Sequence, residues 1–160
     1  NLCPHFRNLK DDQLMAIKEN GGVVFVNFYP GYIDSTYSEK YERVKAQFKF
    51  ELDSLANLYD PNTDLYWYKE NEFLVPYLTE IVPNVNAVIN HIEYIAKLIG
   101  VDHVGIGADW DGVEILPSGI EDITKMPAIT QKLLERGYSE KDVKKILGGN
   151  FKRVFREVSG

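Results

Sequence analysis

The sequence predicts an α/β fold built on a parallel sheet. Two short runs, residues 23–28 (VVFVNF) and 103–107 (HVGIG), are mostly apolar and rich in β-branched residues. Runs of this kind suit strands that are buried on both faces, as in parallel sheets. Segments with the apolar spacing of helices precede, separate and follow the two runs, and this alternation is typical of parallel α/β folds.

The remaining elements are predicted from apolar spacing and capping residues. Helices are expected over residues 11–19, 38–59, 83–99, 126–136, 139–147 and 151–158. Asp11 or Asp12 can cap the first helix, and Ser139 and Asn150 can cap the last two. Gly100 can end the helix that precedes the second strand. Residues 64–73 are polar and aromatic, and no element is predicted there.

Two parallel strands cannot form a complete sheet by themselves. Buried backbone donors and acceptors must be satisfied, and a pair of strands that is apolar on both faces leaves many of them without partners. Further strands are therefore expected from an upstream segment or from another chain. The chain also begins Asn-Leu-Cys-Pro, without an initiator Met, and we expect it to be part of a longer single-domain protein.

Composition excludes several classes of function. The net charge of −6 and the pI of about 5.1 argue against nucleic acid as a partner, because binding phosphates requires clustered Lys and Arg. No apolar run approaches the roughly 18 residues of a membrane helix. Cys3 is the single cysteine, so neither an intrachain disulfide nor a cysteine-based zinc site can form. We expect a buried apolar role for Cys3 rather than a nucleophile.

The strongest candidate for chemistry is the sequence GIGADWDG at residues 105–112. Asp109 and Asp111 follow the second predicted strand, and α/β folds place catalytic groups at the carboxyl ends of parallel strands. In an extended chain the two carboxylates would point the same way, whereas a turn would separate them. The alternative is that both are ordinary turn residues, since Asp and Gly are common in turns.

Arg7 and Tyr32 are the other candidate site residues. A guanidinium suits bidentate binding of a substrate carboxylate, although an Arg near a terminus is often only a surface charge. Tyr32 lies just after the first strand and can either donate to a ligand or cover apolar surface. The three histidines, His5, His91 and His103, have no metal-binding spacing, and neither a dinucleotide fingerprint nor a nucleophile elbow is present.

Several ordered motifs together resemble the renal (membrane) dipeptidase family, peptidase family M19. They are CPHFRN with Asp11-Asp12, GGVVFVNFY at 21–29, GVDHVGIGADWDG at 100–112, GIEDI at 119–123, LLERG at 133–137 and GNFKRVF at 149–155. The resemblance implies the C-terminal part of a (β/α)8 TIM barrel of the metal-dependent hydrolase type, with residues 1–160 contributing strands seven and eight. It also implies a metallodipeptidase with two zinc ions, whose ligands are expected upstream of Asn1.

The resemblance assigns roles to three positions. Arg7 matches the residue that binds the carboxylate of the substrate, Tyr32 matches a residue lining the site near that carboxylate, and Asp109 matches the strand-eight acid that assists proton transfer to the leaving amine. The implied partners are a dipeptide substrate, the N-terminal part of the same barrel and a possible second copy in a homodimer. The isolated chain is expected to be inactive, and the compartment is not predicted.

Residues 35–84 depart from shorter members of the family as a helical insertion. Its position after strand seven favours a lid or a subunit contact near the mouth of the site, or a helix packed on the flank of the barrel. Two other functions remain open. One is a different metal-dependent amidohydrolase, and the other is a non-catalytic binding subunit or degenerate relative.

Overall fold

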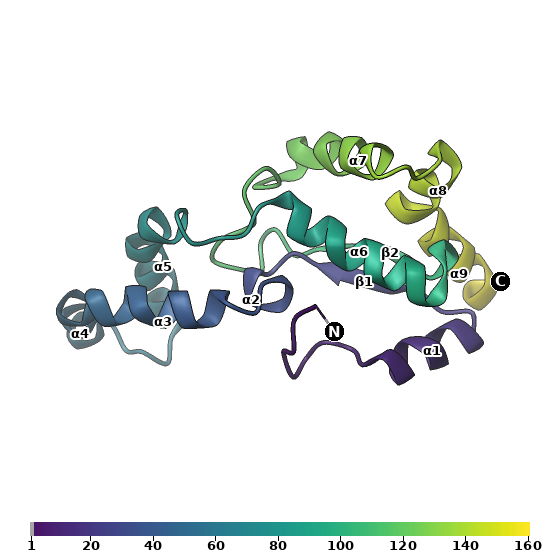
Figure 1. Cartoon of the computed structure of the whole chain (residues 1–160). Helices are drawn as coiled ribbons and strands as arrows, with labels where there is room; N and C mark the ends of the chain where they lie inside the picture. Colours follow the sequence, from purple (N-terminus) through teal and green to yellow (C-terminus); the bar gives the residue numbers. More distant parts are fainter. Residues whose placement is uncertain (1) are drawn as a thin grey trace.

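A computed structural model of the chain describes residues 2–160. The fold is mixed α/β and mostly helical, with a sheet-containing body and a helical arm that extends from it (Figure 1). The body contains α1 (Asp11–Glu19), β1 (Val24–Asn27), α2 (Pro30–Ile33), α6 (Val85–Ile99), the 3-10 turn η1 (Val101–His103) and β2 (Val104–Ala108). After β2 come η2 (Ile123–Lys125), α7 (Met126–Glu135), α8 (Glu140–Lys144), η3 (Lys145–Gly149) and α9 (Asn150–Ser159). The arm consists of α3 (Tyr37–Gln47), α4 (Lys49–Leu58) and α5 (Asp64–Leu78).

Within the described residues, β1 and β2 form a two-stranded parallel sheet. Val24 pairs with Val104 and Val26 with Ile106, but Asn27 pairs with Ala108, so the register shifts at the carboxyl end of the sheet. The shift leaves Gly107 as an extra residue on β2. Bulges of this kind bend a strand and re-aim the side chains that follow. Both strands were predicted to within about one residue, and their parallel pairing is confirmed.

Helix α6 covers one face of this sheet and supplies most of the apolar core. Its stripe, which the sequence predicted, is buried against β1, β2 and α7. The buried residues of α6 are Val85, Val88, Ile89, Ile92, Ile95 and Ile99. In Figure 1, α6 runs between α1 and α7, so the three helices form a layer on that face. Asn84 caps the helix by accepting from the Asn86 N–H, and Gly100 ends it with φ of +101°.

The opposite face of the sheet is open. Phe28 belongs to the core that includes α6 and is fully buried, whereas Phe25 is 42% exposed. The Phe25 ring lies over Gly105, where an added Cβ would come within 2.8 Å of the ring. Gly107 on the same face is also exposed. The prediction that both faces are buried is therefore wrong for this chain by itself, because α9, whose Phe151 ring meets Phe25 edge-on at 6.1 Å, covers only part of this face. The apolar residues of β1 on this face would still suit burial beneath a second layer.

The helical arm corrects two sequence predictions. Residues 38–59 were expected to form a single helix, but the chain bends at Phe48 and forms α3 and α4. The Phe48 ring packs edge-on against Phe73 of α5, with ring centres 5.4 Å apart, so the bend keeps the predicted apolar stripe wrapped around α5. Apolar spacing shows which residues face inward, but it does not show whether the helix stays straight.

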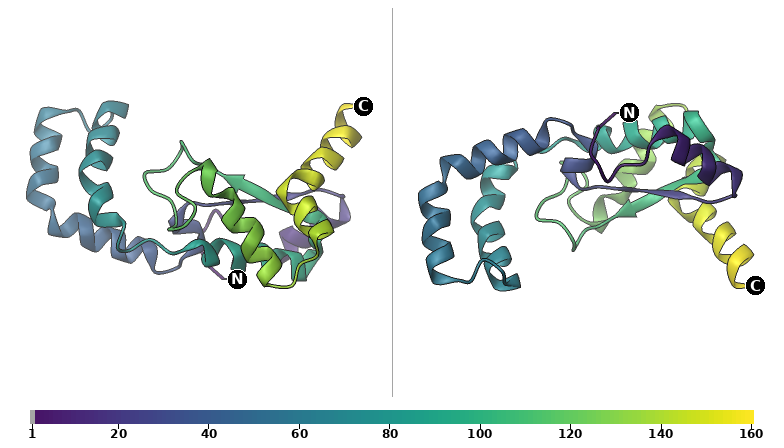
Figure 2. Two further views of the ribbon diagram at one scale, coloured as in Figure 1. Left: turned by 90° about the horizontal axis from the view of Figure 1, so that it is seen from above. Right: turned by 90° about the horizontal axis from the view of Figure 1, so that it is seen from below.

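Helix α5 was not predicted. Its buried positions include Glu70 and Asn71 beside Leu74 and Leu78, and polar residues on the inner face hide the amphipathic pattern. Thr63 begins the helix by accepting from the Tyr66 N–H at 3.3 Å. Figure 2 shows the three helices of the arm in a U shape that stands away from the sheet.

Two helix caps also differ from the predictions. Helix α1 begins after Lys10, where the Gln13 side chain accepts from the Lys10 N–H, so neither Asp11 nor Asp12 is the cap. Asn150 is the first residue of α9 and is buried. Its side-chain amide donates to the carbonyl oxygens of Val101 and Val104 at 2.7 and 2.8 Å. The side chain fastens the start of β2 instead of capping α9.

The molecule exposes more surface than a compact protein of its size. Its accessible area is 9581 Å², whereas a compact monomer of 18.3 kDa exposes about 8,100 Å². The projecting arm and the open sheet face account for this excess. None of the helices formed by residues 2–160 combines the length and apolarity required to cross a membrane.

Candidate active site

A cavity of about 280 Å³ runs along the free edge of β1. All four residues of β1 line it, together with residues from the N-terminal segment 2–9, α2 and α6. Consecutive residues of a strand point to opposite faces, so a cavity that touches all four follows the edge of the strand. The carboxyl end of this edge, at Asn27, is also where Arg7 and Tyr32 lie.

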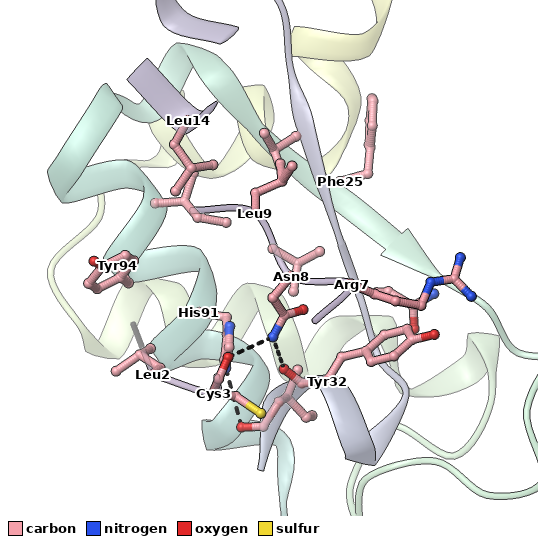
Figure 3. Close-up of a pocket in the computed structure, with 15 residues that line it drawn as sticks. Leu2, Cys3, Arg7, Asn8, Leu9, Leu14, Phe25, Tyr32, His91 and Tyr94 are labelled. Atoms are coloured by element: carbon pink, nitrogen blue, oxygen red, sulfur yellow. Dashed lines mark hydrogen bonds between the residues drawn. The ribbon is translucent and has the colours of Figure 1, made fainter. Parts of the chain in front are cut away.

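Arg7 and Tyr32 form one side of this cavity. The Arg7 guanidinium lies over the Tyr32 ring, 5.7 Å from its centre, which is the geometry of a cation–π contact. Figure 3 shows both side chains on the side of the cavity opposite Leu14 and Tyr94. Arg7 is exposed, so its guanidinium is accessible to an anionic ligand. The structure thus brings together the two residues that the sequence analysis assigned to carboxylate binding.

Hydrogen bonds from Asn8 hold the N-terminal segment next to Tyr32. The Asn8 side-chain amide donates to the carbonyl oxygens of Cys3 and Tyr32 at 3.0 and 2.8 Å (Figure 3). The ring of His5 packs on Tyr32, with centres 4.8 Å apart. Asn8 therefore holds Arg7 in register with Tyr32, a role that sequence reasoning missed, because its partner Tyr32 lies 24 residues away.

Cys3 is buried, as expected, and its thiol lies 3.6 Å from the Gly31 carbonyl oxygen. Burial raises the pKa of the Cys3 thiol, which keeps it protonated and unreactive at neutral pH. The structural role predicted for this residue is confirmed.

Asp109 is joined to the end of β1 by Asn27. The Asn27 side-chain amide donates to Asp109 Oδ2 at 2.8 Å, and its Oδ1 accepts from the Tyr29 N–H at 2.7 Å. Asn27 also lines the cavity that contains Arg7 and Tyr32. One side chain therefore links the predicted acid to the predicted carboxylate-binding residues. The sequence signal for Asn27 is a polar residue at the end of an apolar strand, and its role was not predicted.

The backbone at Asp109 is strained. Ala108 and Asp109 have φ of +46° and +90°, and they are the non-glycine residues with positive φ among residues 2–160. Such conformations cost about 1–3 kcal/mol each and gather at functional sites. Together with the extra residue at Gly107, they turn Asp109 towards Asn27 and end the extended strand. The turn expected as an alternative therefore forms, and Asp109 and Asp111 do not act as a pair in extended chain.

Gly112 closes this turn and makes room for the acid. Its N–H donates to the Asp109 carbonyl oxygen at 3.2 Å. A Cβ at this position would lie 2.1 Å from Asp109 Oδ1, so any side chain there would displace the carboxylate. The absence of a side chain at Gly112 is thus required for the observed direction of Asp109.

The described residues do not form a metal centre. In the stretch 2–160, no three His, Cys, Asp or Glu side chains come together in a way that could hold a metal ion. His91 Nε2 and His103 Nδ1 bond instead to the carbonyl oxygens of Ile33 and Gly22, at 3.2 and 2.8 Å. Burial lowers the pKa of His91, so the neutral ring can donate to Ile33.

Comparison with known proteins identifies the family. The model of the membrane dipeptidase family, peptidase family M19, matches residues 1–160. The chain belongs to this family. Its relatives include Dipeptidase aclJ of Aspergillus oryzae (strain ATCC 42149 / RIB 40), 34% identical over 157 residues, which are 98% of this chain. The chain spans 27% of the length of that relative.

Solved structures of membrane dipeptidase relatives share the fold. The probable dipeptidase PvdM from Pseudomonas aeruginosa matches with a TM-score of 0.66 and 28% identity, over 95% of this chain and 41% of that one. A metallopeptidase from Rhodobacter sphaeroides, solved with a phosphinate mimic of the dipeptide L-Ala-D-Ala, matches with a TM-score of 0.61 and 24% identity, over 94% of this chain and 31% of that one. The second likeness concerns the fold alone.

Proposed function

We propose that this chain is the C-terminal part of a zinc-dependent dipeptidase. The observation that carries the proposal is the match of a dipeptidase family to all 160 residues. In this proposal β1 and β2 are strands seven and eight of a (β/α)8 barrel, and the helical arm is an insertion after strand seven. In this proposal other parts of the full-length enzyme supply the zinc ligands, and residues 2–160 form no cluster of three His, Cys, Asp or Glu side chains that could hold a metal ion.

The open edge of β1 supports the barrel placement. The edge of a sheet presents unpaired N–H and C=O groups, and the cavity beside β1 follows that edge at the depth of the apolar core. An adjoining parallel strand would use those groups and would fill the part of the cavity that runs beside β1, while Arg7 and Tyr32 would stay accessible at the carboxyl end of the edge. The exposed Phe25 and Gly107 would then face the interior of the closed barrel, where small and apolar side chains pack.

Arg7 and Tyr32 would bind the free carboxylate of the substrate. An arginine guanidinium can make two parallel hydrogen bonds to one carboxylate, and both are assisted by charge. The Tyr32 ring beneath it restricts the orientation of the guanidinium, which lowers the entropy lost on binding. Asp109, at the carboxyl end of β2 and oriented by Asn27, would hold the proton that the leaving amine receives.

The experiment compares substrates with and without the carboxylate in the full-length enzyme. Arg7→Ala should lower kcat/KM for a dipeptide about 10- to 100-fold, because a hydrogen bond to a charged group contributes about 1.5–3 kcal/mol. The same variant should leave hydrolysis of the C-terminal amide of that dipeptide nearly unchanged. Arg156→Ala, which removes an exposed Arg from α9, is the matched control.

Three outcomes would contradict all or part of the proposal. Equal loss with both substrates would mean that Arg7 does not bind the carboxylate. A purified full-length enzyme without dipeptidase activity would favour a different amidohydrolase or a non-catalytic subunit, which a screen of other amides would separate. Activity that survives complete removal of metal by a chelator would exclude the zinc part of the proposal.

A further inference from the structure

A row of aromatic rings connects the Arg7–Tyr32 pair with the helical arm. The row, called here the aromatic ladder, contains Phe6, His5, Tyr32, Tyr29, Tyr37 and Tyr41. Neighbouring ring centres are 4.6 to 6.0 Å apart, which is the usual range for interacting aromatic pairs. The ladder begins in the N-terminal segment, crosses the turn after β1 and ends on α3. Ring contacts therefore run without a break from Tyr32, beneath Arg7, to α3.

Glu114 joins the middle of this ladder to the loop that follows β2. The Tyr37 hydroxyl donates to Glu114 Oε1 at 3.4 Å, and the Tyr29 hydroxyl lies close enough to interact with the same carboxyl group. Tyr37 is fully buried and Glu114 is half-buried. Glu114 lies five positions after Asp109 in the sequence, so it ties the ladder to the loop that carries the proposed acid.

The protonation of this cluster agrees with those hydrogen bonds. Burial, with the negative charge of Glu114 second, raises the pKa of Tyr29 to about 12 and raises the pKa of Tyr37 further. Both phenols therefore stay protonated and act as donors at neutral pH. Burial raises the pKa of Glu114 as well, while the donated hydrogen bonds oppose that rise. Glu114 is half-buried, and its partners Tyr29 and Tyr37 come from a different part of the chain. Its carboxyl group can therefore hold these two rings in place.

The contact between Glu114 and the tyrosines bears on Arg7, because Tyr32 supports the Arg7 guanidinium. Arg7 is exposed, and the ring face of Tyr32 lies under its guanidinium. Tyr32 in turn meets Tyr29 edge to face, with centres 4.9 Å apart. A change in the position of Tyr29 would therefore move the surface on which Arg7 rests. Tyr29 also meets the buried Tyr37 edge to face, with centres 6.0 Å apart, and Glu114 interacts with the hydroxyls of both rings.

We propose that Glu114 is a positioning residue for the substrate carboxylate, acting through Tyr29 and Tyr37 on the Arg7–Tyr32 pair. This inference rests on the proposed function, in which Arg7 binds that carboxylate. Glu114 then couples carboxylate binding to the helical arm, since Tyr37 begins α3. The competing explanation is that Glu114 only anchors the arm to the body, with no effect on one end of the substrate more than the other.

The test measures kcat and KM of the full-length enzyme with a dipeptide and with its C-terminal amide. Glu114→Ala should raise KM for the dipeptide about 5- to 10-fold and change kcat by less than about twofold, the size expected for loss of one or two hydrogen bonds. Hydrolysis of the amide should change much less. Glu114→Gln keeps an oxygen that can accept from Tyr37 and should restore most of the affinity. Glu80→Ala, an exposed position near the end of the arm, is the control.

The outcomes separate this inference from the proposed function. If Glu114→Ala lowers kcat/KM equally for both substrates, Glu114 is a structural anchor and the inference is wrong. If that variant does not fold, Tyr37→Phe removes the hydroxyl and keeps the ring, and it should also raise KM for the dipeptide alone. If Arg7→Ala discriminates between the substrates but neither Glu114→Ala nor Tyr37→Phe does, only the positioning role fails. If Arg7→Ala does not discriminate, both proposals fail.

Discussion

Replacement of Asn150 should destabilise the sheet more than its position in a C-terminal helix suggests. Its amide donates to two carbonyl oxygens at the start of β2, at 2.7 and 2.8 Å, and the side chain is 3% exposed. Asn150→Ala leaves both oxygens without this donor. Each buried polar group that loses its partner costs about 1–3 kcal/mol. Because the bond to Val101 is only part-buried, we expect a total loss of about 2–4 kcal/mol in the free energy of unfolding.

Urea unfolding of the full-length enzyme and amide hydrogen exchange over residues 101–108 measure this effect. Amide exchange should accelerate more in β2 than in α6, because the substitution removes the hydrogen bonds from Asn150 at the start of β2. Asn57→Ala, at an exposed position of α4, is the matched control and should change stability by less than about 0.5 kcal/mol. A loss below about 1 kcal/mol for Asn150→Ala, or unchanged exchange in β2, would refute the reasoning.

The remaining predictions concern pH and catalysis. Burial lowers the pKa of His91 below its usual value of 6.5, so stability from the neutral ring is fully present above pH 6.5 and is lost as the pH falls through the lowered pKa. The free energy of unfolding should therefore decrease from pH 7.5 to 5.5, and less so in His91→Gln; equal slopes for the two proteins would contradict this. Asn27→Ala removes the donor to Asp109 and should lower kcat for dipeptides about tenfold, with a smaller change in KM, in steady-state assays. A kcat within twofold of the original enzyme would show that Asn27 does not orient the acid.

Elements with a clear period and a clear end were predictable from the sequence. The stripe of α6 repeats every three or four residues, and Gly100 ends it, so its bounds came within two residues. The β-branched runs predicted β1 and β2 to within about one residue. Helix α5 was missed because Glu70 and Asn71 occupy its buried face, where apolar residues would be expected. The bend at Phe48 depends on α5, so it could not be predicted without that helix.

The site was predictable only in part, because its geometry depends on contacts between distant positions. Arg7, Tyr32 and Asp109 were assigned through resemblance to a family, and their catalytic and binding roles stay predictions. The hydrogen bond from Asn27 to Asp109 spans 82 positions in the sequence, and that from Tyr37 to Glu114 spans 77. Local spacing carries no information about such pairs. The left-handed backbone at Ala108 has no sequence signal either, since alanine rarely adopts it.

The helical arm has an apolar interior of its own. Leu52, Leu74 and Leu78 form its buried centre, and Ile115 packs on this group from the loop after β2, while the sheet and α6 share a different core. A protein divided in this way can change one unit without repacking the other. The arm could be shortened, lengthened or exchanged between relatives, and the strand ends would keep their geometry as long as the contact between Tyr37 and Glu114 survived. Such modularity would allow the surroundings of the strand ends to diversify while Arg7, Tyr32 and Asp109 keep their arrangement.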